Sequence, residues 1–476
     1  MKDKKTLIYR TIDLISVIAL YYIVGKKSIF LYVLSISLYN IFLSCFSNIS
    51  IKDTLNNIHT TKSKQKIFKY LLLVVSIISL LFFLFSILVS DVIGMYLHIN
   101  NTLPIFVIMG ISIITRPVIR VLSEYLENTT NNKNYGLLIS LYDVIDKILL
   151  ILIAIFGFII LKIDSVAILY LSKIFSFIII IYLLYFTRNI RKTYDYVPLE
   201  DKISYKKEIR GILKCNNTRS IINVVKQSFY YLSIIVLYLV LSTRYNYKTN
   251  EIEDAISFVY FYAIYIVNYL VYLVKLLINK LPKEVDVIDR VYYGFKIIIT
   301  TIIVLSMISP LTCKLIFLDV DRTIYLVMAN LLGLFIFLYD ATFEYIKKKK
   351  VIYISLVLGF IMKIILIIPL INAFYRTGYN LLYGDILSTI IAMFTSIIIN
   401  YIHLRSNNKS TEKYFEKILS ILYDNIILAI ILIIIQFIIP MDTSDYLKTL
   451  GILIIYLVIS LIYIFVNNKL KNKKKG

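Results

Sequence analysis

Apolar residues gather along this chain in long runs that short polar connections separate. About fourteen runs approach the roughly 20 residues that a helix needs to cross the ~30 Å hydrocarbon core of a bilayer. The pattern therefore predicts an all-α integral membrane protein with about 14 transmembrane helices. The predicted spans are 7–24, 29–51, 67–90, 103–122, 137–161, 165–187, 221–242, 256–278, 293–318, 322–345, 351–373, 381–403, 419–440 and 446–467.

Two parts of this pattern are alike. Glu124–Tyr125 ends the fourth span, and the fifth contains KILLI from Lys147; Glu344–Tyr345 ends the tenth span, and the eleventh contains KIILI from Lys363. This similarity predicts two related six-helix lobes, and transporters built from parallel repeats hold their substrate between the halves. The predicted divisions are an N-terminal lobe over 1–187, a basic cytoplasmic connector over 188–220, a C-terminal lobe over 221–403, and the last two helices with a basic tail over 404–476.

Basic residues crowd alternate connections between the spans. They gather at the N-terminus, in 188–220, at Lys347–Lys350 and in the C-terminal tail. Such loops stay in the cytoplasm, which predicts that both termini are cytoplasmic. The net charge of +23 is then explained by topology and by contact with anionic membrane lipids. No nucleic-acid-binding motif accompanies the charge, so no nucleic-acid partner is predicted.

Several cations lie deep inside the predicted spans. Lys147 is about 15 Å along its span, and Lys173 and Lys363 are at similar depth, too far from the ends to snorkel easily. A charge at this depth costs at least ~2.5 kcal/mol, so it usually faces a protein-lined cavity or a partner. The pattern predicts a cationic cavity that binds an anionic headgroup such as a pyrophosphate. The candidate substrate-binding residues are Arg10, Lys147, Lys173, Lys226 and Lys363.

Acids accompany some of these cations. Asp143 precedes Lys147 by four residues, the favourable order for a helical ion pair, and Asp146 is close by. Asp13 lies one turn from Arg10. These three acids are candidates for ion pairing or for Na⁺ or H⁺ coupling, and the alternative is that the pairs merely hold helices in place. Lys173 and Lys363 have no acid nearby in the sequence. The scattered cysteines and histidines predict neither a metal site nor a cofactor.

Three stretches resemble the multidrug/oligosaccharidyl-lipid/polysaccharide flippase superfamily, in its branch of lipid II flippases, stage V sporulation protein B relatives and Wzx-like polysaccharide flippases. They are GKKSIFLYVLSISLYNIFLSCFSNISIKDTL from Gly25, RVLSEYLENTTNNKNYGLLISLYDVIDK from Arg120, and KLLINKLPK from Lys275. The resemblance implies location in the bacterial cytoplasmic membrane and essential arginines in spans one, two and eight. Arg10 matches the first. Span two has no arginine, and the third position falls near Ala263. The resemblance also implies that 419–467 forms a groove for a lipid tail.

The first functional hypothesis is a flippase that moves a polyprenyl-pyrophosphate-linked saccharide, such as lipid II or a surface-polysaccharide precursor, across the membrane by alternating access. The alternative is a drug or metabolite efflux antiporter coupled to Na⁺ or H⁺ through Asp13 or Asp143. Unpaired lysine beside paired acid would favour the flippase, and unpaired acid would favour the antiporter. An enzyme is not predicted, because the external loops are short; the longest covers roughly 242–255.

Overall fold

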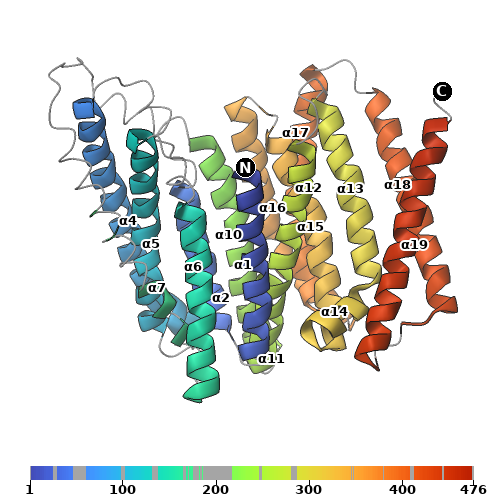
Figure 1. The fold of residues 1–476 in the computed structure, drawn as a ribbon, viewed down its shortest axis with the longest axis horizontal. Coiled ribbons are helices and arrows are strands. Elements are labelled where there is room, and N and C mark those ends of the chain that lie inside the picture. Colours follow the sequence, from blue (N-terminus) through green and yellow to red (C-terminus); the bar gives the residue numbers. More distant parts are fainter. Residues whose placement is uncertain are drawn as a thin grey trace. The chain divides into compact units, whose positions relative to one another are not determined.

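A computed structural model describes most of the chain as helices. The described residues are 2–24, 29–46, 61–97, 102–130, 138–163, 168–169, 171–174, 182, 185, 217–245, 249–279, 287–344, 346, 348–378, 380–407, 412–441 and 444–473. Over these residues every regular element is a helix, as Figure 1 shows, so the predicted all-α class is confirmed. The predicted span 165–187 and the connector 188–220 lie almost entirely outside the described residues.

Eleven described helices are long and apolar enough to cross a membrane, and each overlaps a predicted span. Two further spans correspond to shorter helices. Phe30–Cys45 is a shorter apolar helix. The predicted fifth span, 137–161, is formed by α6 (Leu138–Ala154) and a π-helical continuation, η2 (Ile155–Ile160). The protein is therefore a multi-pass integral membrane protein.

The chain divides into two compact units, 1–257 and 258–476. In the first unit α4 packs along α5, α1 along α6, and α2 against both α5 and α10. The predicted lobes divide the chain elsewhere, and their similarity stays a prediction. The elements of the first unit are α1 (Lys2–Val24), α2 (Phe30–Phe46), α4 (Thr61–Leu97), α5 (Thr102–Thr130), α6, η2, α7 (Leu171–Ile174), α10 (Asn217–Leu239), η4 (Val240–Arg244) and α11 (Thr249–Ser257).

One helix of the first unit, α4, is much longer than the others there. It contains 37 residues, of which Ile67–Met95 are strongly apolar. Leu73, Leu81 and Leu88 are among its exposed side chains. An apolar face of this length is the surface expected of a helix in contact with lipid.

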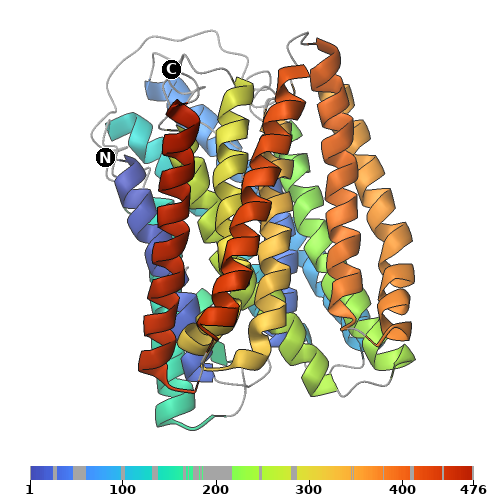
Figure 2. The same cartoon turned by 90° about the vertical axis from the view of Figure 1, so that its right-hand side faces the viewer.

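In the second unit α16 packs along α17, and α15 contacts α12, α13 and α17. Figure 2 shows α18 and α19 as an antiparallel pair whose connection lies at one end of the helices. The elements are η5 (Phe258–Ala263), α12 (Ile264–Asn279), α13 (Val287–Met307), α14 (Ser309–Phe317), η6 (Val320–Arg322), α15 (Thr323–Glu344), α16 (Lys349–Arg376), α17 (Leu382–Asn407), α18 (Glu412–Ile438) and α19 (Tyr446–Lys473).

The predicted single span over 293–318 is wrong in its second half. The helix α13 ends at Met307, and the short helix α14 begins at Ser309 with Pro310 in its first turn. Proline lacks an N–H donor and clashes with the preceding turn, so it begins a new helix here. Pro117 and Pro369, by contrast, lie inside continuous helices.

An apolar core holds the pair α18–α19 against the rest of the second unit. Leu428 and Leu432 of α18 and Tyr456 of α19 pack with Val304 and Leu311 from α13 and α14. The hydroxyl of Tyr456 also donates a hydrogen bond to the carbonyl of Ile439 at 3.0 Å. The last two helices thus share a core with α13 and α14.

Candidate functional site: buried charged pairs

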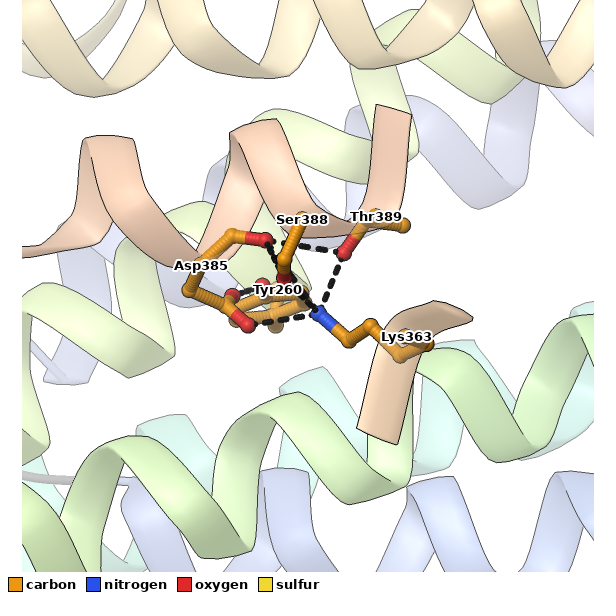
Figure 3. A network of polar contacts seen from close by, with 5 residues as sticks. All are labelled: Tyr260, Lys363, Asp385, Ser388 and Thr389. Carbon is orange, nitrogen blue, oxygen red and sulfur yellow. Dashed lines mark hydrogen bonds and ion pairs between the residues drawn. The ribbon is translucent and has the colours of Figure 1, made fainter. Parts of the chain in front are cut away.

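The most deeply buried charges of the second unit form one network between α16 and α17. The Nζ atom of Lys363 lies 2.7 Å from Oδ1 of Asp385, and both side chains are completely shielded from solvent. The other carboxylate oxygen, Oδ2, accepts a hydrogen bond from the hydroxyl of Tyr260. Figure 3 shows these residues converging with Ser388 and Thr389. The network is an internally neutral ion pair with polar partners on both sides.

The ammonium of Lys363 is surrounded by oxygen atoms. It donates to the hydroxyls of Ser388 at 2.8 Å and Thr389 at 2.6 Å, and to the backbone carbonyl of Asp385 at 3.2 Å, besides the carboxylate. An ammonium group has three donors, so four acceptors saturate it. Buried polar groups are stable only when they are satisfied in this way.

Two glycines allow the helices that carry this network to approach closely. A Cβ atom at Gly359 of α16 would lie 2.3 Å from Oγ of Ser396 and 2.9 Å from the carbonyl oxygen of Ala392. At Gly384 of α17 it would lie 2.6 Å from the backbone of Leu370 and Ile371. Small residues at such contacts let membrane helices pack backbone to backbone. Lys363 lies one helical turn after Gly359, so its side chain enters this tight interface.

The first unit also contains buried pairs, arranged around α6. Nζ of Lys147 lies 3.8 Å from Oδ1 of Asp13 on α1. The neighbouring residue Asp146 forms an ion pair with Lys173 on α7. Adjacent residues of a helix point about 100° apart, so α6 pairs with α1 on one side and with α7 on the other. The predicted residues Asp13, Asp146, Lys147 and Lys173 therefore lie in one part of this unit.

The pairs of the first unit are less completely enclosed. The exposed fraction is 9% for the Lys147 side chain and 19% for Asp13. Oδ1 of Asp146 is buried and accepts no hydrogen bond from the part of the chain that the structure describes. Besides the attraction of Asp146, the positive charges of Lys147 and Arg116 also act on Lys173, so acids and bases lie close together in this part of the first unit.

The remaining predicted cations are less buried than those of these pairs. Arg10 is exposed on α1, and Lys226 is half-buried on α10. The side chain of Asp143 lies outside the described residues, so the proposed Asp143–Lys147 pair stays a prediction. Lys173 and Lys363, which have no acid nearby in the sequence, find their partners on other helices.

Sequence reasoning missed four residues of the network in the second unit. Asp385, Ser388, Thr389 and Tyr260 were not predicted to surround Lys363. One signal was available, because Asp385 is the one acid within the predicted span 381–403. It falls in the first turn of α17, where the helix dipole favours negative charge.

Two further ion pairs of the second unit involve residues outside the candidate set. Lys275 of α12 donates to Asp340 of α15 at 2.7 Å. Arg322 lies 3.4 Å from Asp319, with its guanidinium 5.2 Å from the ring centre of Phe258. These contacts join neighbouring helices and loops of that unit. Among the described residues, no group of three or more His, Cys, Asp and Glu side chains gathers as metal ligands would.

No protein-family model matches the sequence, and no curated protein matches it. The fold, however, is similar to solved structures. The lipid II flippase MurJ in an inward closed conformation matches with a TM-score of 0.67 over 98% of this chain and 98% of its own, at 15% identity. An outward-facing multidrug resistance MATE family transporter of the MOP superfamily has a TM-score of 0.48, covering 86% of this chain and 97% of its own, at 13% identity. The chain thus has a fold similar to that of the MurJ structure.

Proposed function

We propose that this protein is a flippase that moves a polyprenyl-pyrophosphate-linked saccharide from the inner to the outer leaflet of the cytoplasmic membrane. The observation that carries this proposal is the match to the lipid II flippase fold over 98% of both chains. That match includes the final helix pair, α18–α19. Alternating access would require a conformational change that opens the bound headgroup first to one side of the membrane and then to the other.

In this proposal the first unit supplies the contacts to the diphosphate. Lys147 and Lys173 lie together with Arg116, and charge-assisted hydrogen bonds from lysine and arginine suit phosphate oxygens. Their acidic partners would keep these cations stable while no substrate is bound. Arg10, on the exposed side of α1, and the half-buried Lys226 are candidates for the initial contact. Lys363 is not assigned this role, because it is shielded and its donors are used.

The nature of the saccharide is left to experiment, because two of the three arginines implied by the resemblance have no counterpart. The position expected in span eight falls near Ala263, which is buried in η5. An alanine there supplies no donor for a phosphate. The proposal therefore names the shared chemistry, a polyprenyl pyrophosphate, which lipid II and surface-polysaccharide precursors have in common.

The last two helices would hold the lipid tail. Phe437 on α18 and Leu447, Leu461 and Phe465 on α19 are exposed and apolar. A polyprenyl chain would gain free energy by contact with such surface while the headgroup crosses the membrane.

The test is rescue of bacteria depleted of their own lipid II flippase. Wild-type protein should restore growth, and Lys147→Gln/Lys173→Gln should not, although it reaches the membrane. Lys350→Gln is the matched control, because Lys350 is exposed at the start of α16. Rescue by the double variant would refute these headgroup contacts. If wild type fails while well expressed, the same variants are assayed in cells that lack a polysaccharide flippase. Failure there too would refute the proposal.

A second design separates headgroup contact from mere helix packing. Lys147→Gln/Asp13→Asn removes both charges of one ion pair. If Lys147 only holds α6 to α1, this variant should function like wild type, because neutral replacement of a buried pair is often tolerated. We expect loss of rescue with normal membrane levels, which assigns the lysine to the substrate.

One observation favours the antiporter as a second candidate. Oδ1 of Asp146 is buried without a hydrogen-bond donor among the described residues, and such an oxygen is able to receive a proton or a cation. Efflux of a cationic dye from cells, driven by a Na⁺ or H⁺ gradient and abolished by Asp146→Asn, would support this function. Gradient-independent rescue of flippase-depleted cells would argue against it.

A further inference from the structure

The surroundings of the Lys363 ammonium have the composition of a cation-binding site. Its four neighbouring oxygens are one carboxylate oxygen, one backbone carbonyl and two hydroxyls, at 2.6–3.2 Å from Nζ. Hard metal cations without strong geometric preference take oxygen ligands of these kinds. One carboxylate balances one positive charge, which suits a monovalent ion. All four oxygens come from Asp385, Ser388 and Thr389, within little more than one turn of α17.

The oxygens around the Lys363 ammonium are also shielded from solvent. Lys363, Asp385 and Ser388 have no exposed surface, and Thr389 is only 1% exposed. Tyr260 closes the far side of the carboxylate through its hydroxyl. Ser388 and Thr389 each also donate to the carbonyl of Asp385, which fixes the hydroxyl oxygens toward the ammonium (Figure 3). The oxygens are thus positioned by α17 itself, and the lysine comes from α16.

We propose that the Lys363 ammonium is a built-in cation, which fills a site that would otherwise bind a monovalent alkali ion. The second unit then needs neither Na⁺ nor K⁺ to neutralise Asp385 and to join α16 to α17. The inference goes beyond the proposed flippase function, because it concerns this unit whatever the transported molecule is. It also has a chemical consequence: truncating the lysine side chain should turn a closed ion pair into an ion-dependent site.

The direct test is thermal unfolding of the purified full-length protein in detergent, at constant ionic strength, in NaCl, KCl or choline chloride. Choline is too large for the site and serves as the reference salt. Wild type should unfold at the same temperature in all three salts. Lys363→Ala should unfold at a lower temperature in choline, and NaCl or KCl should restore roughly 5 °C at saturation. Methylammonium chloride should restore stability as well, because it returns the missing ammonium.

The control variant removes the charge that any ion must neutralise. Lys363→Ala/Asp385→Asn should unfold at the same temperature in all three salts, because no carboxylate is left. Tyr353→Phe, a change at an exposed position of α16, should behave like wild type. An equal response of single and double variants to Na⁺ would place the ion elsewhere and overturn the proposal. So would a Lys363→Ala variant that no small cation stabilises.

The proposal remains testable if Lys363→Ala does not fold. In that case Lys363→Ala/Asp385→Asn should accumulate in membranes to a higher level than the single variant, because the unneutralised carboxylate is the cause. If the double variant accumulates to no higher level than the single variant, this explanation is overturned. Wild-type protein provides an independent readout. If Na⁺ stabilises wild type and Asp385→Asn removes this effect, the oxygens around Lys363 bind an external ion, which would overturn the proposal.

Discussion

The lysines at matching places in the KILLI and KIILI segments have different surroundings. Lys363 is completely shielded, lies 2.7 Å from its acid, and is saturated by oxygens of the next helix along the chain. Lys147 is also buried, but its partner Asp13, 3.8 Å away on the first helix, is 19% exposed. The pair of the second unit is therefore short and fully enclosed, whereas that of the first unit is longer and less enclosed. Similar local sequence thus accompanies a saturated ion pair in one unit and a longer ion pair in the other.

The largest expected effect is on the closed pair. Asp385→Ala leaves the Lys363 ammonium buried without its countercharge, which should lower the free energy of unfolding by about 3–5 kcal/mol. Equilibrium unfolding in mixed detergent micelles measures the change. Lys363→Met/Asp385→Leu is the matched control and should recover most of the loss, because a neutral apolar pair needs no countercharge. A double variant as unstable as the single one would contradict this account.

A smaller effect is expected at the corresponding acid of the first unit. Asp146→Asn leaves Lys173 with a neutral partner, and we expect a loss of about 2 kcal/mol. The loss is smaller because one oxygen of this carboxylate already lacks a donor among the described residues. The same unfolding measurement, made beside Asp385→Ala, ranks the two sites. A loss at Asp146 larger than that at Asp385 would reverse the comparison.

The hydroxyl of Tyr260 measures how much a single hydrogen bond contributes to the network of the second unit. Tyr260→Phe removes one hydrogen bond to the charged carboxylate of Asp385 and leaves the Lys363 pair in place. The expected loss of unfolding free energy is about 1.5 kcal/mol. Tyr353→Phe, at an exposed position, should cost nothing measurable. If both tyrosine variants are equally stable, the network does not depend on the hydroxyl.

The smallest effect on stability is expected at Asp13. Asp13→Asn replaces a carboxylate that is 19% exposed and 3.8 Å from Lys147 with a neutral amide, so the unfolding free energy should fall by about 1 kcal/mol, less than at Asp146. Under the proposed flippase function transport should respond more strongly, because loss of the carboxylate changes the net charge around Lys147. Rescue of flippase-depleted cells at matched membrane levels measures this second readout. A large loss of stability would show that this pair is structural too.

Hydropathy was sufficient to predict the fold class and the position of most spans. In a membrane the backbone must satisfy its own hydrogen bonds, which favours helices, and the length of each apolar run then locates a span. It failed at Pro310, where an apolar run hides a helix break between α13 and α14. It also predicted that Lys363 is deep, but not its partner. Asp385 lies 22 residues away across a turn, and only the close contact of α16 with α17 brings the two together. Pairing between helices leaves no local pattern in the sequence.

The long helix α4 has a consequence for the membrane around the protein. The 21 residues between Lys69 and Asp91 carry no charge and would be about 31 Å long, close to the ~30 Å of hydrocarbon. The other residues of this 37-residue helix would therefore extend past the hydrocarbon region. A bilayer with much shorter or longer acyl chains would act on α4 by hydrophobic mismatch before any substrate arrives.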